Sequence, residues 1–122
     1  MTRKTALLVD EGTDFRDMFA CLLEFLKMDV TCVDDGEKAV EKVKENPYYL
    51  VLMDVHVSGL TGLEALKKMK ALRPDQKIVI MSSDRDPLFV VERKAFEEGA
   101  MECLLKPVEL SDIDRIIREA TK

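Results

Sequence analysis

Five short apolar runs, each followed by an amphipathic stretch, are the feature that most constrains how this chain folds. The runs occupy residues 6–9, 30–33, 49–53, 78–81 and 101–105. They are continuous rather than alternating, which is typical of strands covered on both faces. The stretch after the first run has helical spacing (Phe15, Phe19, Leu22, Phe25, Leu26), and the stripe at Phe89, Arg93 and Phe96 is weaker. Strict alternation predicts an α/β fold: a doubly wound, five-stranded parallel sheet with helices on both faces.

Glycine and proline support the same division of the chain. Glycine stands where helices are expected to begin or end, and proline stands between elements, where a missing N–H costs little. These residues are Gly36, Gly62 and Gly99, and Pro47, Pro74 and Pro107; Pro87 falls in the first turn of the fourth predicted helix. Ser111, with Asp114 three residues later, resembles the capped start of the last helix. With no linker or repeat, residues 1–122 are expected to form a single domain.

Charge and cysteine usage narrow the class of protein. The net charge of −5 argues against a nucleic-acid clamp or an anionic-membrane binder, since both need basic patches. Cys21, Cys32 and Cys103 lie in apolar stretches without a CxxC pair, which favours buried thiols in a reducing cytosol. The apolar run after Lys4 is too short for a signal peptide or a membrane span. A cytoplasmic location is therefore expected.

The polar residues that follow the strands carry the functional information. Asp10 and Glu11 end the first run, Asp54 the third, Ser82 and Ser83 the fourth, and Lys106 the fifth. Parallel strands bring their carboxyl ends to one edge of the sheet, where ligands bind at the point at which strand order reverses. With the flavodoxin-like order 2-1-3-4-5, that point lies between the first and third strands. The second strand, which ends in Asp34 and Asp35, would lie at the edge, away from the site.

This set of side chains suits phosphoryl chemistry. Three neighbouring carboxylates repel one another unless a counter-charge is present, and Mg²⁺ with its preference for oxygen ligands supplies one. A carboxylate such as Asp54 can then act as the nucleophile toward phosphorus. Lys106 would neutralise charge on the transferred group, and a strand-end hydroxyl would hydrogen-bond the product.

With these motifs in place, the chain resembles the receiver (CheY-like) domain of two-component response regulators over essentially its whole length. The resemblance rests on residues 7–11 with Arg16, 50–54, 59–64, 78–82, and 99–100 leading to 104–107. It implies transfer of a phosphoryl group from the phosphohistidine of a sensor histidine kinase to Asp54. The domain would signal rather than act as an enzyme on an external substrate, although it would catalyse its own phosphotransfer and slow dephosphorylation. Its output would be a downstream protein contact or a homodimer through the fourth helix, fifth strand and fifth helix.

The resemblance also implies a role for each site residue. Glu11 and Asp54 would ligate Mg²⁺ directly, the backbone carbonyl of His56 would add a ligand, and Asp10 would act largely through water. Ser82 would be the switch hydroxyl and Lys106 the phosphate-pairing cation. The Lys106–Pro107 bond is similar to one that is often cis in this family. The positions of His56 and Asp84 are similar to sites that tune how water reaches the phosphoryl group.

Several residues depart from the family pattern. Ser58 stands where proline is usual, which predicts a looser loop, and Thr61 replaces a common aspartate. Glu11 is one methylene longer than the commoner aspartate. Cys103 occupies the switch position, where tyrosine or phenylalanine is usual, so the form of the signal output is open.

Simpler interpretations stand beside these. The acids and Ser82 could serve only as turn or capping residues, Lys106 could be a solvated surface residue, and Ser83 rather than Ser82 could be the switch hydroxyl. A lone histidine such as His56 seldom makes a metal site by its side chain. The alternative function is a receiver-like protein-interaction domain that no longer depends on phosphorylation. A flavin protein or a dehalogenase-type phosphatase fits less well, because Glu11–Asp14 is too acidic for a flavin phosphate loop and His56 stands where a second acid is needed.

Overall fold

The computed structural model describes residues 4–83 and 88–121, in which five strands alternate with five helices. The strands are β1 (Lys4–Val9), β2 (Met28–Val33), β3 (Leu50–Asp54), β4 (Ile78–Ser82) and β5 (Glu102–Leu105). The helices are α1 (Thr13–Phe25), α2 (Gly36–Glu45), α3 (Gly62–Leu72), α4 (Leu88–Glu97) and α5 (Leu110–Thr121). The predicted α/β fold is confirmed.

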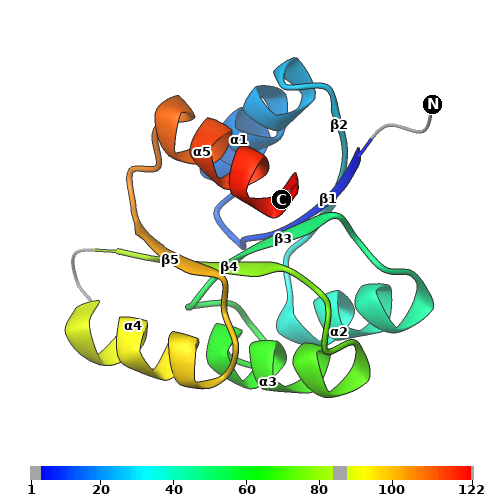
Figure 1. The fold of residues 1–122 in the computed structure, drawn as a ribbon, viewed down its shortest axis with the longest axis vertical. Coiled ribbons are helices and arrows are strands. Elements are labelled where there is room, and N and C mark those ends of the chain that lie inside the picture. Colours follow the sequence, from blue (N-terminus) through cyan, green and yellow to red (C-terminus); the bar gives the residue numbers. More distant parts are fainter. Residues whose placement is uncertain (1–3, 84–87, 122) are drawn as a thin grey trace.

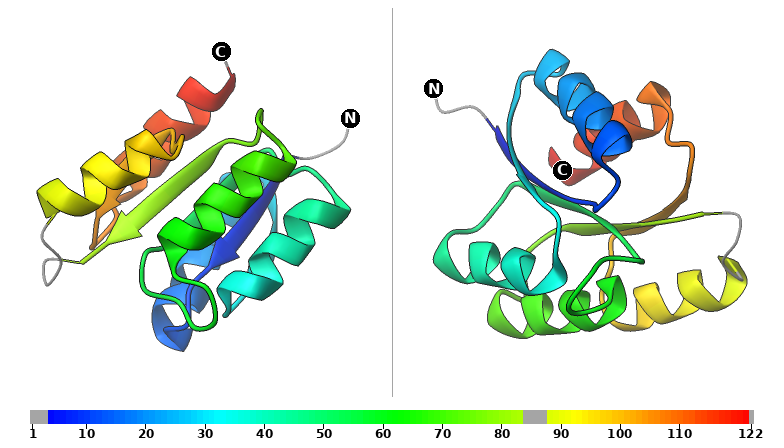
Figure 2. Two further views of the ribbon diagram at one scale, coloured as in Figure 1. Left: turned by 90° about the horizontal axis from the view of Figure 1, so that it is seen from below. Right: turned by 180° about the vertical axis from the view of Figure 1, so that it is seen from behind.

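The strands form one parallel sheet in the order β2-β1-β3-β4-β5, which confirms the predicted order. Helices α1 and α5 cover one face, and α2, α3 and α4 cover the other (Figure 1). Figure 2 shows the same three layers from below and from behind. At the carboxyl edge the register pairs Val9 with Met53 and Asp54 with Met81. The segments that follow β1 and β3 therefore begin side by side.

Two apolar layers hold the sheet between its helices. Successive strand residues point to opposite faces, so Leu7 packs toward α2 and α3 while Leu8 packs with Phe19 of α1. The central strand β3 is buried on both faces: Leu50, Val51, Leu52 and Met53 expose none of their surface. This double coverage is the physical reason that the central runs are continuous in the sequence.

The edges of the sheet differ from this expectation. Along β2 only Met28 is buried, because this strand has a neighbour on one side only. The prediction of buried thiols is wrong: Cys21 and Cys32 are exposed and Cys103 is half-buried, although all three are free. Phe25, expected on the inner face of the first helix, is 72% exposed at the last turn of α1.

Helix starts follow the glycines but not the predicted serine. Helices α2 and α3 begin at Gly36 and Gly62, as predicted. A Cβ on Gly36 would lie 2.2 Å from the carbonyl oxygen of Leu60, so this close approach of two backbones requires glycine. The predicted cap at Ser111 is wrong, because α5 already begins at Leu110. Pro87 lies outside the described residues.

Candidate functional site

The carboxyl edge of the sheet brings together three charged residues that lie far apart in the sequence. Asp10 follows β1, Asp54 ends β3 and Lys106 follows β5. The Lys106 ammonium donates to Asp10 Oδ2 at 2.6 Å and also to Asp54 Oδ2. Asp10 is 3% exposed, so this triad is largely withdrawn from water. A buried group of this kind needs its opposite charges in contact, and Lys106 provides them.

The second oxygen of each acid is fixed by the backbone. Asp10 Oδ1 accepts from the Gly12 N–H at 2.7 Å, and Asp54 Oδ1 accepts from the His56 N–H at 2.7 Å. Arg16 Nη1 donates to the Asp10 carbonyl at 3.0 Å. The turn-forming role considered from the sequence is therefore present, and it coexists with the convergence on Lys106. Each carboxylate uses one oxygen for its turn and presents the other to the cation.

Burial and charge set the protonation of the pair. Burial raises the pKa of Asp54, the charge of Asp10 adds to that rise, and the Lys106 ammonium and the His56 N–H oppose it. Burial alone would lower the pKa of Lys106, but its hydrogen bonds to Asp10 and Asp54 and their charges outweigh burial and hold this pKa above the ordinary value. Lys106 is therefore charged at neutral pH, while Asp54 ionises at a cost.

A cavity of about 290 Å³ opens over the triad. Its lining residues are Asp10, Glu11, Gly12, Asp54, His56, Ser83 and Lys106. The carboxylates and the peptide oxygens offer the hard donors that Mg²⁺ prefers, so the residue set fits this cation. Within 4–83 and 88–121, however, no three His, Cys, Asp or Glu side chains are arranged as a metal site. In this structure the acids have other partners.

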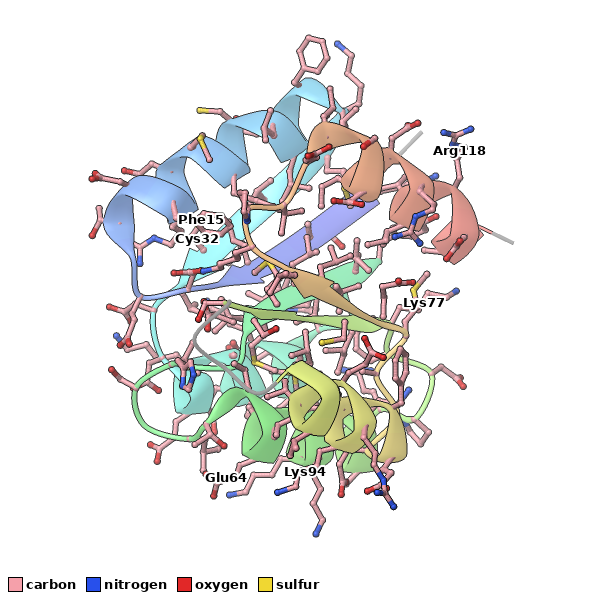
Figure 3. The ribbon with its side chains drawn as sticks, turned by 90° about the vertical axis from the view of Figure 1, so that its left-hand side faces the viewer. Phe15, Cys32, Glu64, Lys77, Lys94 and Arg118 are labelled. Atoms are coloured by element: carbon pink, nitrogen blue, oxygen red, sulfur yellow. The ribbon has the colours of Figure 1, made fainter. Side chains whose placement is uncertain are left out.

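Glu11 is the acid that stands apart. It is exposed, and its Oε2 accepts a hydrogen bond of 2.5 Å from Ser58 Oγ in the loop between β3 and α3. Thr61, another departure from the family pattern, has a structural role here. It caps α3 in a capping box with Glu64 (labelled in Figure 3).

The two strand-end serines occupy different environments. Ser82 exposes none of its surface, and its Oγ has no hydrogen-bond partner among the described residues. Ser83 is half-buried and lines the cavity. Asp84 lies outside the described residues. A buried hydroxyl without a partner is costly, and such a group beside a charged cavity suits a ligand that supplies the missing acceptor.

One aromatic contact was not anticipated from the sequence. The ring of Phe15 lies under the Lys106 ammonium, 4.0 Å from nitrogen to ring centroid, and it packs against Phe19 at 5.4 Å. Figure 3 labels Phe15 at the start of α1. The only sequence signal was an aromatic residue in the first turn after the acid pair. The predicted switch position, Cys103, is half-buried and packs against the core on the α2–α4 side.

The second strand is away from the site, as expected from the order. Asp35 caps α2 by accepting from the N–H groups of Glu37 and Lys38, and Asp34 pairs with Lys38 in an exposed ion pair. The Lys106–Pro107 bond is cis.

Comparison with known proteins identifies the family. A family model described as "Response regulator receiver domain" matches residues 6–118. The chain belongs to the receiver domain family of response regulators. It is 36% identical to the two-component response regulator ORR11 of Oryza sativa subsp. indica, over 90% of this chain and 76% of that protein. It is 30% identical to the transcriptional regulatory protein ZraR of Escherichia coli K12, over 93% of this chain and 25% of that protein.

Solved receiver structures share the fold. A response regulator receiver domain protein from Clostridium thermocellum has a TM-score of 0.89 at 24% identity, covering 96% of this chain and 93% of that one. The receiver domain of the sensor histidine kinase PA1611 of Pseudomonas aeruginosa PAO1, described with a magnesium ion coordinated in the active-site cleft, has a TM-score of 0.89 at 22% identity. That match covers 99% of this chain and 100% of the other.

Family membership gives the receiver domain its general role. Receiver domains take part in two-component phosphorelay signalling, in which they relay signals from histidine kinases to downstream effectors. No helix among the described residues is both long and apolar enough to span a bilayer.

Proposed function

We propose that this receiver domain, taken as one domain over residues 1–122, accepts a phosphoryl group on Asp54 from the phosphohistidine of a cytoplasmic sensor histidine kinase. The observation that carries the proposal is the Asp10–Lys106–Asp54 triad beneath a cavity at the carboxyl edge. In the transfer, a carboxylate oxygen of Asp54 forms a bond to phosphorus as the phosphorus–nitrogen bond to the donor imidazole breaks. The imidazole nitrogen keeps the electron pair of that bond.

The surrounding residues hold the charges that this transfer develops. Lys106 already contacts the Asp54 carboxylate and is placed to pair with phosphoryl oxygens. Mg²⁺, when bound, would neutralise part of the phosphoryl charge; Asp10, Glu11, Asp54 and the His56 carbonyl are the proposed ligands. The magnesium described for the PA1611 receiver domain supports this assignment.

The hydroxyl groups and neighbouring side chains would set the outcome. Ser82, buried without a partner among the described residues, would donate to the phosphoryl group, and this recruitment would report phosphorylation to the β4–α4 region. Ser83, His56 and Asp84 would tune access of water. Cys103 holds the switch position with a side chain much smaller than an aromatic ring.

The output surface is proposed to be the face formed by α4, β5 and α5. It exposes four large apolar side chains: Val90, Phe96, Leu105 and Leu110. Patches of this kind mark protein contacts, here with a downstream protein or a second copy of the domain. The competing function, a receiver-like interaction domain independent of phosphate, is less consistent with a buried triad whose groups are expensive to retain.

Intact-mass measurement tests the proposal. Wild-type protein and Asp54→Asn are each treated with acetyl phosphate and Mg²⁺ and then weighed. We expect the wild type to gain the mass of one phosphoryl group and Asp54→Asn to gain none. A wild type that gains no mass would favour the phosphate-independent function, and equal gains in both proteins would place the acceptor elsewhere.

A further inference from the structure

Ser58 is the one residue that joins the exposed acid of the site to a rigid part of the fold. Its backbone carbonyl accepts from the Gly36 N–H at 2.9 Å, and Ser58 forms a β-bridge with Asp35. Asp35 in turn caps α2. These contacts fix the backbone of Ser58 to the start of α2, so the sequence expectation of a looser loop at this serine is wrong for its backbone pairing.

The next residue makes the same junction compact. Gly59 has φ +76°, and a Cβ there would lie 2.8 Å from the Asp35 carboxylate. Only glycine fits that conformation and that spacing without strain. The hydroxyl of Ser58 is therefore presented from a well-defined position at the edge of the site.

Glu11 is the mobile partner in this contact. It is exposed, and its side chain has one more rotatable bond than aspartate. Ser58 Oγ donates to its Oε2 at 2.5 Å, within the range of a charge-assisted hydrogen bond. Asp10 and Asp54, by contrast, are both turned to Lys106.

We propose that Ser58 is a positioning residue that holds Glu11 away from the other two acids when no metal is bound, and so opposes Mg²⁺ binding. This inference rests on the proposed function, in which Glu11 ligates the ion. Binding exchanges the Ser58 contact for a metal bond, because Glu11 must turn toward Asp10 and Asp54. Metal occupancy is thereby linked to the junction between the β3–α3 loop and the start of α2.

Calorimetric titration of Mg²⁺ into the unphosphorylated protein tests this role. Removing the hydroxyl in Ser58→Ala is expected to tighten Mg²⁺ binding roughly threefold, the scale of one exposed hydrogen bond. Ser58→Thr keeps a hydroxyl on an exposed residue and should stay close to the wild type. In a Glu11→Asp background, whose shorter acid cannot keep the same contact, Ser58→Ala should have no further effect.

The outcomes separate the inference from the function on which it rests. Equal Mg²⁺ affinity in the wild type and Ser58→Ala would overturn the inference, and so would weaker binding, which would mean that Ser58 prepares Glu11 for the ion. If the wild type nevertheless gains phosphoryl mass at Asp54, the proposed function stands. A wild type that neither binds Mg²⁺ nor gains mass ends both.

Discussion

The two ends of the sheet treat buried polar groups in opposite ways. At the amino end, Gln76 is 4% exposed, and all its polar atoms are engaged. Its side chain accepts from the Tyr48 N–H at 2.9 Å and donates to the carbonyls of Tyr48 at 2.7 Å and Lys77 at 3.2 Å. Lys77 continues the network by donating to the Ala120 carbonyl at 2.9 Å. Figure 3 labels Lys77 at the opposite edge from Phe15.

The carboxyl end leaves its buried groups unsettled. Ser82 Oγ lacks a partner among the described residues, and Asp54 is a carboxylate whose pKa is raised by burial. One sheet thus has an end whose polar groups stabilise the fold and an end whose groups await a ligand. Perturbed groups of the second kind concentrate at functional sites because recognition and chemistry need them.

The sharpest test of this contrast is Gln76→Ala. The substitution leaves the buried N–H and carbonyl of Tyr48 without their partner, which should lower the free energy of unfolding by about 2–3 kcal/mol. Urea denaturation measures the change, with Asp75→Ala at the exposed neighbouring position as the control. A loss no larger than that of the control would remove the distinction between the two ends.

Asp54→Asn should act in the opposite direction and by less. Because the folded-state pKa of Asp54 is raised, the stability associated with its protonated form is full below the unfolded-state pKa and is lost as pH rises through the folded-state pKa. The neutral amide removes that cost, so we expect a gain of about 1 kcal/mol at neutral pH. The gain should shrink as pH falls and Asp54 protonates.

Urea denaturation at neutral and at acidic pH measures this dependence. Asp75→Asn, a charge-matched change at an exposed site, should show no comparable gain. A destabilised Asp54→Asn at neutral pH would mean that the contact with Lys106 outweighs the burial of the carboxylate.

Ser82→Ala should have the smallest effect. Removing a buried hydroxyl without a partner relieves its desolvation and opens only a small space, so the free energy of unfolding should rise by a few tenths of a kcal/mol. The same urea assay measures it. A loss comparable to that of Gln76→Ala would show that the hydroxyl is hydrogen-bonded after all.

Much of the fold was predictable because its signals are local. Apolar runs, helical spacing and the glycines at 36 and 62 reflect burial and backbone geometry close to each residue. The errors lie where neighbours decide exposure: Cys21 and Phe25 lie on a helix face that nothing covers, and Cys32 lies on an edge strand. A sequence pattern does not record which surface a neighbouring element leaves open.

The candidate site divides along the same line. Its acids and lysine could be named from the sequence, because parallel topology sends all strand ends to one edge. Their pairing could not be named: the rotamer of Lys106 selects Asp10 and Asp54, and Phe15 reaches that lysine from another element.

The sequence by itself determined the order of elements, the layering and the edge at which the polar residues collect, because periodic burial is a property of neighbouring residues along the chain. Only the tertiary structure decided that Glu11 bonds Ser58 and that Ser82 is buried without a partner among the described residues. Such contacts join residues from different loops and strands, and their geometry depends on how closely the whole fold packs.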